Sequence, residues 1–297
     1  MATVATQSSN MREELEALAY ELKQWRREGV TSVPVSEETL EGLRSTVRRL
    51  AAAAPPSAPP SASPTLVVEE EAPAKPQKAD MPPPPELEIP DGTKAEQMAW
   101  LRDRVLNDKE GLSHLKSGKQ LVFGVGSIDA KILFCGEAPG AEEEIQAEPF
   151  VGPAGQLLTK IIKAAGMSRE EVYISNIMNW RPEMPTDFGN RPPTGDEMAY
   201  CLPFLKAQVE IVKPAAIVAL GKTAVDGLLG PDPKRRMSHI RGQWFEFAGT
   251  PIIPTYHPSY LLRNNSNSTK RQVWEDILLV MERLEMPISE KQRGFFL

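Results

Sequence analysis

Residues able to bind or react occur in this sequence directly after short apolar runs, where buried strands would end. The runs are Lys131–Gly136, Val172–Asn176, Ala216–Gly221 and Ile252–Tyr256. Glu137 follows the first run, Asn176 ends the second, and His257 follows the last. These side chains exchange protons or hydrogen bonds, so together they could bind a polar ligand or catalyse its hydrolysis.

Helical stretches separate the apolar runs and must hold these side chains in place. They fit Gly155–Ala165, Asp196–Val212, Thr223–Leu229 and Lys270–Leu284. Short buried strands separated by helices predict an α/β fold, a three-layer α/β/α sandwich with a central, mostly parallel four-stranded sheet. In such sheets ligands bind beyond the carboxyl ends of the strands, so we expect the post-strand residues to lie together.

The N-terminal third differs in composition from the rest. Residues 1–54 carry two apolar stripes at helical spacing, which predict a helical segment and a plausible hairpin. Residues 55–91 hold 12 of the 28 prolines and predict a disordered linker, because they cannot bury a core. Residues 92–297 then form the domain that carries the chemistry. The helical segment could bind a protein partner or be a weakly structured arm.

Composition and charge set limits on location and partners. No run of about 18 apolar residues occurs and the N-terminus lacks the pattern of a secretory signal, so we predict no membrane span and a cytoplasmic protein. Two cysteines cannot build a disulfide framework. The net charge of −6 argues weakly against nucleic-acid binding. Residues 91–297 carry only −1, however, and bases cluster at Lys234–Arg236 and Arg241, so a local patch can contact phosphates.

Each post-strand segment, taken alone, has an ordinary explanation. Glycine and proline form turns, glutamates favour helix starts, and a phenylalanine such as Phe150 usually lies in the core. Asn176 could cap a helix, and a lone His257 is more often structural than catalytic. The order of the segments is more informative: GEAPG, then PFVGPAG, then a strand ending in asparagine, then NRPP, then HPSYLLR.

This combination closely resembles the family 4 uracil-DNA glycosylases, the bacterial and archaeal enzymes described as iron–sulfur uracil-DNA glycosylases. The resemblance covers roughly residues 95–285, in order and without large gaps. It implies the α/β/α fold that the strand pattern predicts independently. It also implies an enzyme that flips uracil out of DNA and hydrolyses the N-glycosidic bond, leaving an abasic site for base excision repair. Uracil-containing DNA is then the expected partner.

The resemblance assigns roles around the base. Phe150 matches the stacking phenylalanine of the family, and Asn176 matches the asparagine whose amide pairs with O4 and N3–H of uracil. Cytosine presents the opposite donor and acceptor pattern, so a fixed amide rejects it. Gly136 and Ala138 are expected to complete the uracil-binding pocket.

Cleavage leaves uracil as an anion, so a hydrogen-bond donor to its O2 should stabilise the transition state. His257 matches the family's histidine for this role, as a neutral donor or an electrostatic stabiliser. The resemblance also implicates Glu137, Glu143 and Asn190 in handling water. We favour Asn190 with Glu143 assisting, although the insertion Glu183–Gly189 could move Asn190.

The HPSYLLR segment looks like the loop that enters DNA. Leu261 and Leu262 would replace the flipped base in the stack, while Ser259 and Arg263 would hold phosphates. The alternative is that the leucines belong to the core. Arg241 is a further candidate for phosphate contact.

The cluster ligands of the family are mostly missing. Members carry four cysteines for a [4Fe–4S] cluster: two before the first motif, one after the uracil-reading asparagine and one on the next helix. Cys201 matches the last, but Trp180 occupies the third position and residues 93–130 contain no cysteine. Cys135 lies in a predicted strand. Because four thiolates are normally required, we predict no cluster and no other metal, with Trp180 filling part of the space as a hypothesis.

Two other interpretations stay open. The first is a non-catalytic or covalent uracil-DNA binding protein on the same fold. A covalent subfamily uses a histidine in a KRRIH-type insertion, whereas Lys234–Arg236 and His239 lie elsewhere in the order. The second is a different hydrolase or a nucleotide-binding enzyme on this fold, such as one that acts on mismatched or deaminated purines. The joint presence of Phe150, Asn176 and His257 favours the glycosylase over both.

Overall fold

The computed structural model describes residues 81–183 and 190–297. The predicted helical segment 1–54, most of the linker and residues 184–189 of the insertion lie outside this part. Residues 81–91, the end of the predicted linker, form no helix or strand. Met81, Leu87 and Ile89 nevertheless pack against the hydrophobic core, so contacts with the domain begin before residue 92.

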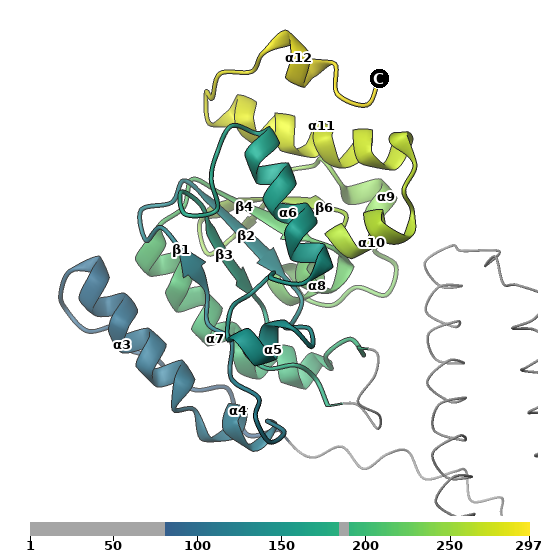
Figure 1. The fold of residues 1–297 in the computed structure, drawn as a ribbon. Coiled ribbons are helices and arrows are strands. Elements are labelled where there is room, and N and C mark those ends of the chain that lie inside the picture. Colours follow the sequence, from purple (N-terminus) through teal and green to yellow (C-terminus); the bar gives the residue numbers. More distant parts are fainter. Residues whose placement is uncertain (1–80, 184–189) are drawn as a thin grey trace, which may run out of the picture. The chain divides into compact units, whose positions relative to one another are not determined.

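Six strands form one sheet in the order β1-β3-β2-β4-β6-β5 (Figure 1). The four central strands are parallel: β3 (Tyr173–Asn176), β2 (Ile132–Gly136), β4 (Ala216–Leu220) and β6 (Thr250–Thr255). They confirm the four predicted strands. The edge strands β1 (Val125–Gly126) and β5 (Phe245–Phe247) are antiparallel to their neighbours. They were not predicted, because two or three residues are too few to show a period.

Helices connect and flank the strands. They are α3 (Lys94–Leu106), α4 (Lys109–Ser113), α5 (Glu143–Gln146), α6 (Pro153–Ala164), α7 (Gly195–Val212), α8 (Lys222–Leu229), α9 (Met237–Ile240), α10 (Pro258–Arg263), α11 (Asn267–Arg283) and α12 (Glu290–Arg293). The four predicted helices correspond to α6, α7, α8 and α11. Helix α3 was not predicted, although Thr93 and Glu96 form a capping box at its start. None of these described helices has the length and apolar composition needed to cross a bilayer.

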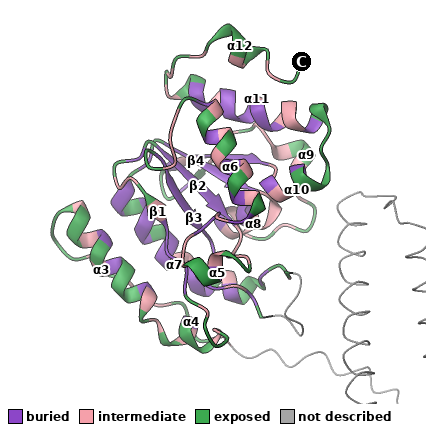
Figure 2. Ribbon diagram, in the orientation of Figure 1, coloured by how far each residue is buried: buried purple, intermediate pink, exposed green. Residues whose placement is uncertain are grey.

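Helices cover both faces of the sheet, as expected for a three-layer sandwich. Leu133 and Cys135 of β2 belong to one hydrophobic cluster, which includes residues of α3, α7 and α8. Ile132 and Phe134 point to the other face and join a cluster with α6 and α11. The four central strands therefore lie buried between two helical layers, as the colouring of Figure 2 shows.

Strand register aligns the ends of the parallel strands. Gly136 of β2 pairs with Asn176 of β3, and Leu220 of β4 pairs with Thr255 of β6. The residues that follow these positions must leave the sheet at one edge. The fold thus brings the predicted post-strand residues to a common place.

Candidate active site

Gly136, Phe150 and Asn176 meet at the carboxyl ends of β2 and β3. A Cβ atom at Gly136 would clash with Asn176 Oδ1 and Phe150 Cζ, and would lie 2.7 Å from Phe150 Cε2. Only glycine therefore lets the amide and the ring approach so closely. Phe150 and Asn176 are both buried. The structure brings together the ring and the amide that the sequence assigned to one pocket.

The side-chain oxygen of Asn176 is buried and, within the described part of the chain, has no hydrogen-bond partner. An unpaired buried acceptor costs roughly 1–3 kcal/mol, so it calls for an explanation. The strand end that carries it is fixed, because Ile177 N donates to Gly136 O at 3.0 Å. A ligand with an N–H group would satisfy this oxygen.

The backbone at Phe150 adopts an uncommon conformation. Its φ is 56°, in the left-handed region that non-glycine residues rarely occupy. Gly155 in the first turn of α6 makes room for this turn, since a Cβ there would lie 2.6 Å from Phe150 Cα. Strain of this kind persists where the surroundings enforce it, often at functional sites. Here it turns the ring toward Gly136 and Asn176.

Glu143 links the loop after β2 to the turn that carries Phe150. Its carboxylate accepts hydrogen bonds from the backbone N–H groups of Gly140 at 3.1 Å, Val151 at 3.1 Å and Gly152 at 3.0 Å. Three donors of this kind hold the carboxylate in one orientation. The geometry favours a positioning role for Glu143, and its assistance to water stays a prediction.

His257 stands beside Phe150, with ring centroids 5.7 Å apart. It is the N-cap of α10, and its Nδ1 accepts from Ser259 N at 3.2 Å and lies 2.8 Å from Ser259 Oγ. A backbone N–H can only donate, so Nδ1 is an acceptor and the neutral ring carries its proton on Nε2. Burial, aided by the positive charge of Arg263, lowers the pKa of His257 to about 4. The ring is therefore a neutral donor at pH 7.

Asn190 is held by a chain of polar contacts that the sequence did not predict. Asn190 is exposed, and its Oδ1 accepts from Arg181 Nε at 2.9 Å. Arg181 Nη1 in turn donates to Glu144 Oε1 at 2.9 Å, and Lys119 Nζ lies 3.2 Å from the same oxygen. Glu144 is buried, although the sequence suggested a solvated helix start.

Glu137 and Ala138 continue from Gly136 into the loop after β2, and both are half-buried. The carbonyl of Glu137 accepts from Met178 N at 3.1 Å, which ties this loop to the one after β3. Ala138 packs against the cluster that contains α3 and α7. The structure thus places both residues next to the pocket, while the catalytic role of Glu137 stays a prediction.

The segment expected to be a loop entering DNA is the short helix α10, which begins at Pro258. Leu262 is 49% exposed and can reach a ligand. Leu261 is 4% exposed, so the prediction that it enters DNA is wrong and its core alternative holds. Ser259 contacts His257 Nδ1, and Arg263 is exposed near that ring.

Arg241 was expected to contact phosphates, and the structure corrects this. Its guanidinium pairs with the buried carboxylate of Asp276, with Nη2–Oδ1 at 2.8 Å and Nε–Oδ2 at 3.1 Å. Thr255 Oγ1 also donates to Asp276, at 2.6 Å. Removing the arginine would leave a buried charge unpaired, so its role is structural. Arg235, in the neighbouring basic run, likewise pairs with Asp226.

Trp180, at the third of the positions where the resemblance implies cluster ligands, belongs to an aromatic stack with His114 and Tyr200. The His114 and Trp180 rings are 4.9 Å apart and nearly parallel, and the Tyr200 ring is 6.0 Å from Trp180. Trp180 is buried, with no partner for its Nε1 among the described residues. Cys201, which follows Tyr200 in the chain, belongs to the same hydrophobic cluster as Trp180 and Tyr200.

The residues present do not fit a [4Fe–4S] cluster. Four thiolates are the normal requirement, and the whole sequence contains only Cys135 and Cys201. Both are buried, which raises the pKa of each thiol well above its usual range. Within residues 81–183 and 190–297, His, Cys, Asp and Glu form no group of three or more that could hold a metal ion.

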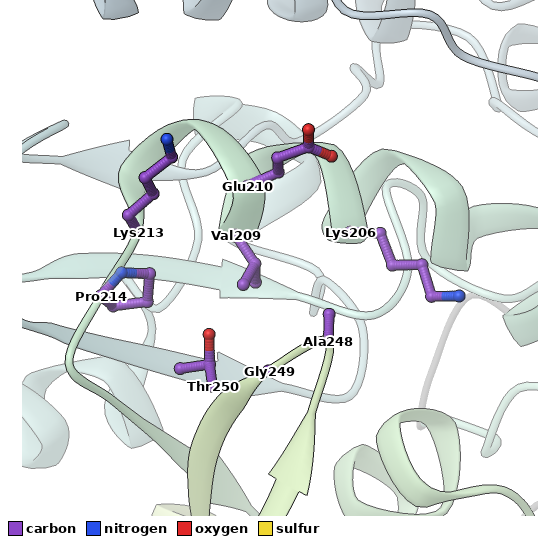
Figure 3. A pocket seen from close by; sticks show the side chains of 8 residues that line it. All are labelled: Lys206, Val209, Glu210, Lys213, Pro214, Ala248, Gly249 and Thr250. Atoms are coloured by element: carbon purple, nitrogen blue, oxygen red, sulfur yellow. The ribbon is translucent and has the colours of Figure 1, made fainter.

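A hollow of about 520 Å³ lies near the opposite, amino ends of β4 and β6 (Figure 3). Its lining comes from the end of α7 and from the turn between β5 and β6: Lys206, Val209, Glu210, Lys213, Pro214, Ala248, Gly249 and Thr250. None of the predicted site residues lines it. The predicted site residues lie instead at the carboxyl ends of the parallel strands.

Comparison with known proteins identifies the family of the chain. The family model "Uracil DNA glycosylase superfamily" matches residues 123–278, which include every strand and the site residues named above. A type-4 uracil-DNA glycosylase of Thermotoga maritima is 44% identical over 190 residues, 62% of this chain and 93% of that protein. A type-4 enzyme of Saccharolobus solfataricus is 38% identical over 176 residues, 57% of this chain and 78% of that protein.

A type-5 uracil-DNA glycosylase of Pyrobaculum aerophilum is less similar, at 28% identity over 159 residues, 48% of this chain and 68% of that protein. The family model covers more than half of the chain, and the type-4 similarity extends over nearly all of the Thermotoga protein. The chain therefore belongs to the uracil-DNA glycosylase superfamily, within its type-4 family.

Proposed function

We propose that this chain is a monofunctional uracil-DNA glycosylase that removes uracil from DNA, leaves an abasic site and so initiates base excision repair. The observation that carries this proposal is the buried Oδ1 of Asn176, which has no hydrogen-bond partner among the described residues and is set against the Phe150 ring at Gly136. This arrangement offers a flat surface and an acceptor to a planar base that carries an imide N–H.

Recognition requires the uracil nucleotide to leave the helix, because its reacting atoms are unreachable inside a duplex. The flipped base would stack on Phe150. Its N3–H would donate to Asn176 Oδ1, while the amide NH₂ of the same residue would donate to uracil O4. Cytosine has an acceptor at N3 and a donor at its exocyclic nitrogen, so both contacts would fail. Asn176 thus sets the specificity for uracil.

Hydrolysis breaks the bond between C1′ and N1, and the bonding electron pair leaves with the base. The sugar gains oxocarbenium character, water attacks C1′ and loses a proton, and uracil departs as an anion. The Nε2–H of His257 would donate to uracil O2 as this charge develops. A preorganised donor of this kind typically contributes about 2.7–4 kcal/mol to the lowering of the barrier.

The side chain of Asn190 would orient the attacking water, and Glu137 is a further candidate for this role. Asn190 Oδ1 is held by Arg181, so its amide has a defined orientation. Leu262 and Arg263 are exposed on α10, near His257, and would contact DNA around the flipped nucleotide. The cytoplasmic location and a protein partner for residues 1–54 stay predictions.

We also propose that this chain works without an iron–sulfur cluster. The cysteine count supports this, since two thiols cannot supply four ligands. The aromatic stack of His114, Trp180 and Tyr200 would supply packing in that region instead.

A base-release panel tests the function. Labelled oligonucleotides that contain uracil, cytosine, hypoxanthine or xanthine are incubated with the full-length protein and then treated with alkali, which cleaves abasic sites. We expect strand cleavage with uracil and none with cytosine. Cleavage restricted to the deaminated purines would contradict the proposal. A complex with uracil-DNA that survives denaturation, without alkali-labile sites, would instead establish the covalent binding protein.

A further inference from the structure

We propose that Arg181 is a positioning residue, which fixes the amide of Asn190 for the hydrolytic step. The inference rests on the proposed role of Asn190 in orienting water. It adds a residue that does not itself touch substrate and acts through another side chain.

The guanidinium of Arg181 binds two side chains of the described part of the chain at once. Its Nε donates to Asn190 Oδ1 at 2.9 Å and its Nη1 donates to Glu144 Oε1 at 2.9 Å. The group is planar and its donors have a fixed geometry, so anchoring one of them fixes the direction of the other. With its oxygen held by Arg181, the amide of Asn190 has one defined orientation.

The other end of this chain of contacts is firmly held. Glu144 is buried on α5, and its carboxylate also pairs with Lys119 at 3.2 Å. Its backbone carbonyl accepts from Gln120 N at 2.8 Å. The neighbouring Glu143 fixes the turn that carries Phe150, so one short helix links the stacking ring to the water-handling side of the site.

The residue that precedes Arg181 in the chain is also held in place by packing. Trp180, the residue before it, is buried and stacks on His114 at a ring distance of 4.9 Å. The Arg181 side chain is 12% exposed. A side chain buried to this extent is better suited to hold a neighbouring residue in place than to bind a DNA phosphate. Asn190, by contrast, is exposed and follows the insertion, so without Arg181 its amide would rotate in solvent.

The test compares Arg181→Lys, Asn190→Ala and the double variant of the full-length protein. Lysine keeps the charge beside Glu144 but cannot hold both partners as the guanidinium does. The readouts are the single-turnover rate of uracil release, the Kd for uracil-DNA and the melting temperature. Arg271→Lys is the matched control, because Arg271 is 20% exposed, pairs with Glu275 and has no assigned role in the site.

We expect Arg181→Lys to slow single-turnover release by roughly 10- to 100-fold, the size of effect seen when a reacting group is slightly misplaced. The Kd should change less than about twofold, since the contact aligns a group without binding DNA. In the Asn190→Ala background the same substitution should have little further effect, because the partner is already lost. Arg271→Lys should keep the wild-type rate.

Two results would overturn the inference. One is a wild-type rate of uracil release for Arg181→Lys. The other is an equal loss of rate when Arg181→Lys is introduced into the wild type and into the Asn190→Ala variant. Full activity of Asn190→Ala would instead show that Asn190 does not orient water. The inference about Arg181 would then fail as well, because it rests on that role. If Arg181→Lys fails to fold, Glu144→Gln tests the same chain of contacts, with the same dependence on Asn190 expected.

Discussion

At the scale of single residues, the site depends on groups whose surroundings leave them one hydrogen-bonding role. The N–H of Ser259 forces Nδ1 of His257 to accept, and burial keeps the ring neutral. The β2–β3 register and Gly136 place the Asn176 amide against Phe150. Neutral groups with fixed donors and acceptors suit a reaction in which charge appears on the base.

The state of His257 gives a pH prediction. With its pKa lowered to about 4, the imidazole should stay neutral as pH falls from 8 to 6, so the single-turnover rate should show no step near pH 6.5 due to this group. Nitrogen-15 NMR, with His257→Asn to assign the signal, should show the Nε2–H tautomer and a titration near pH 4. A titration near pH 6.5 with a parallel loss of rate contradicts this account.

The lowered pKa of His257 also makes the free energy of unfolding depend on pH. The unfolded chain takes up a proton at its ordinary histidine pKa of about 6.5, whereas the folded chain does so only near pH 4. This contribution is therefore fully present above pH 6.5 and is lost as pH falls toward 4. Denaturant unfolding should show that the free energy of unfolding falls less over this pH range for His257→Asn than for the wild type. Identical pH dependence in both proteins would rule the contribution out.

Some of these residues could be predicted from sequence and others could not. Phe150, Asn176 and His257 stand in ordered motifs, and the structure brings them together. Arg181 and Glu144 lie 37 positions apart and share no local pattern, so their pairing needs the fold. Arg241 failed as a predicted DNA contact for the same reason, since its partner Asp276 lies 35 positions away.

At the scale of elements, periodicity predicted the parallel strands and the long helices, because each buries a regular set of apolar residues. It could not detect β1 and β5, which are two and three residues long. Helix α10 was mistaken for a loop, although proline at its first position is a helix-start signal. This helix determines which of the two adjacent leucines faces outward.

Leu261 and Leu262 should therefore respond differently to truncation. Leu261→Ala removes a buried side chain and should lower the free energy of unfolding by about 2–5 kcal/mol. Leu262→Ala removes an exposed one, so it should leave stability nearly unchanged and weaken binding to uracil-DNA. Urea unfolding and DNA titration measure the two effects. Equal destabilisation by both substitutions would show that α10 is placed incorrectly.

Gly136→Ala tests the meeting of β2, β3 and the Phe150 turn. The added methyl group would collide with the Asn176 oxygen and the Phe150 ring, so we expect uracil release to fall by about 100-fold or more. Gly195→Ala is the control, since a Cβ there meets nothing within 4 Å. Single-turnover assays on both variants make the comparison. Normal activity of Gly136→Ala would mean that the pocket is wider than described.

At the scale of the whole molecule, the chain has the family's fold, and its sequence contains two cysteines where a [4Fe–4S] cluster normally requires four. Trp180, in the aromatic stack with His114 and Tyr200, stands where the resemblance to the family implies a third cysteine. Large buried rings can hold neighbouring segments together by packing, the role that a structural cluster fills through ligand bonds. Sequence could predict the missing ligands by counting cysteines. It could not predict His114, which lies 66 positions before Trp180.

Iron should therefore be dispensable to this protein. Protein purified from iron-supplemented cells should contain far less than four irons per chain, and chelation should change neither its melting temperature nor its rate. Trp180→Ala, by contrast, should lower the free energy of unfolding by about 3–5 kcal/mol, because it removes a large buried side chain. Elemental analysis and denaturant unfolding provide the measurements. Stoichiometric iron that is lost together with activity contradicts the proposal.

The most direct test of the central claim is single-turnover release of uracil from a labelled oligonucleotide, for the wild type and Asn176→Ala, with alkali to reveal abasic sites. We predict alkali-labile sites with the wild type. The variant should be roughly 100- to 1,000-fold slower, as expected when a preorganised hydrogen-bonding group is lost. Binding of uracil-DNA by the wild type without alkali-labile sites, or equal rates for both proteins, would contradict the account.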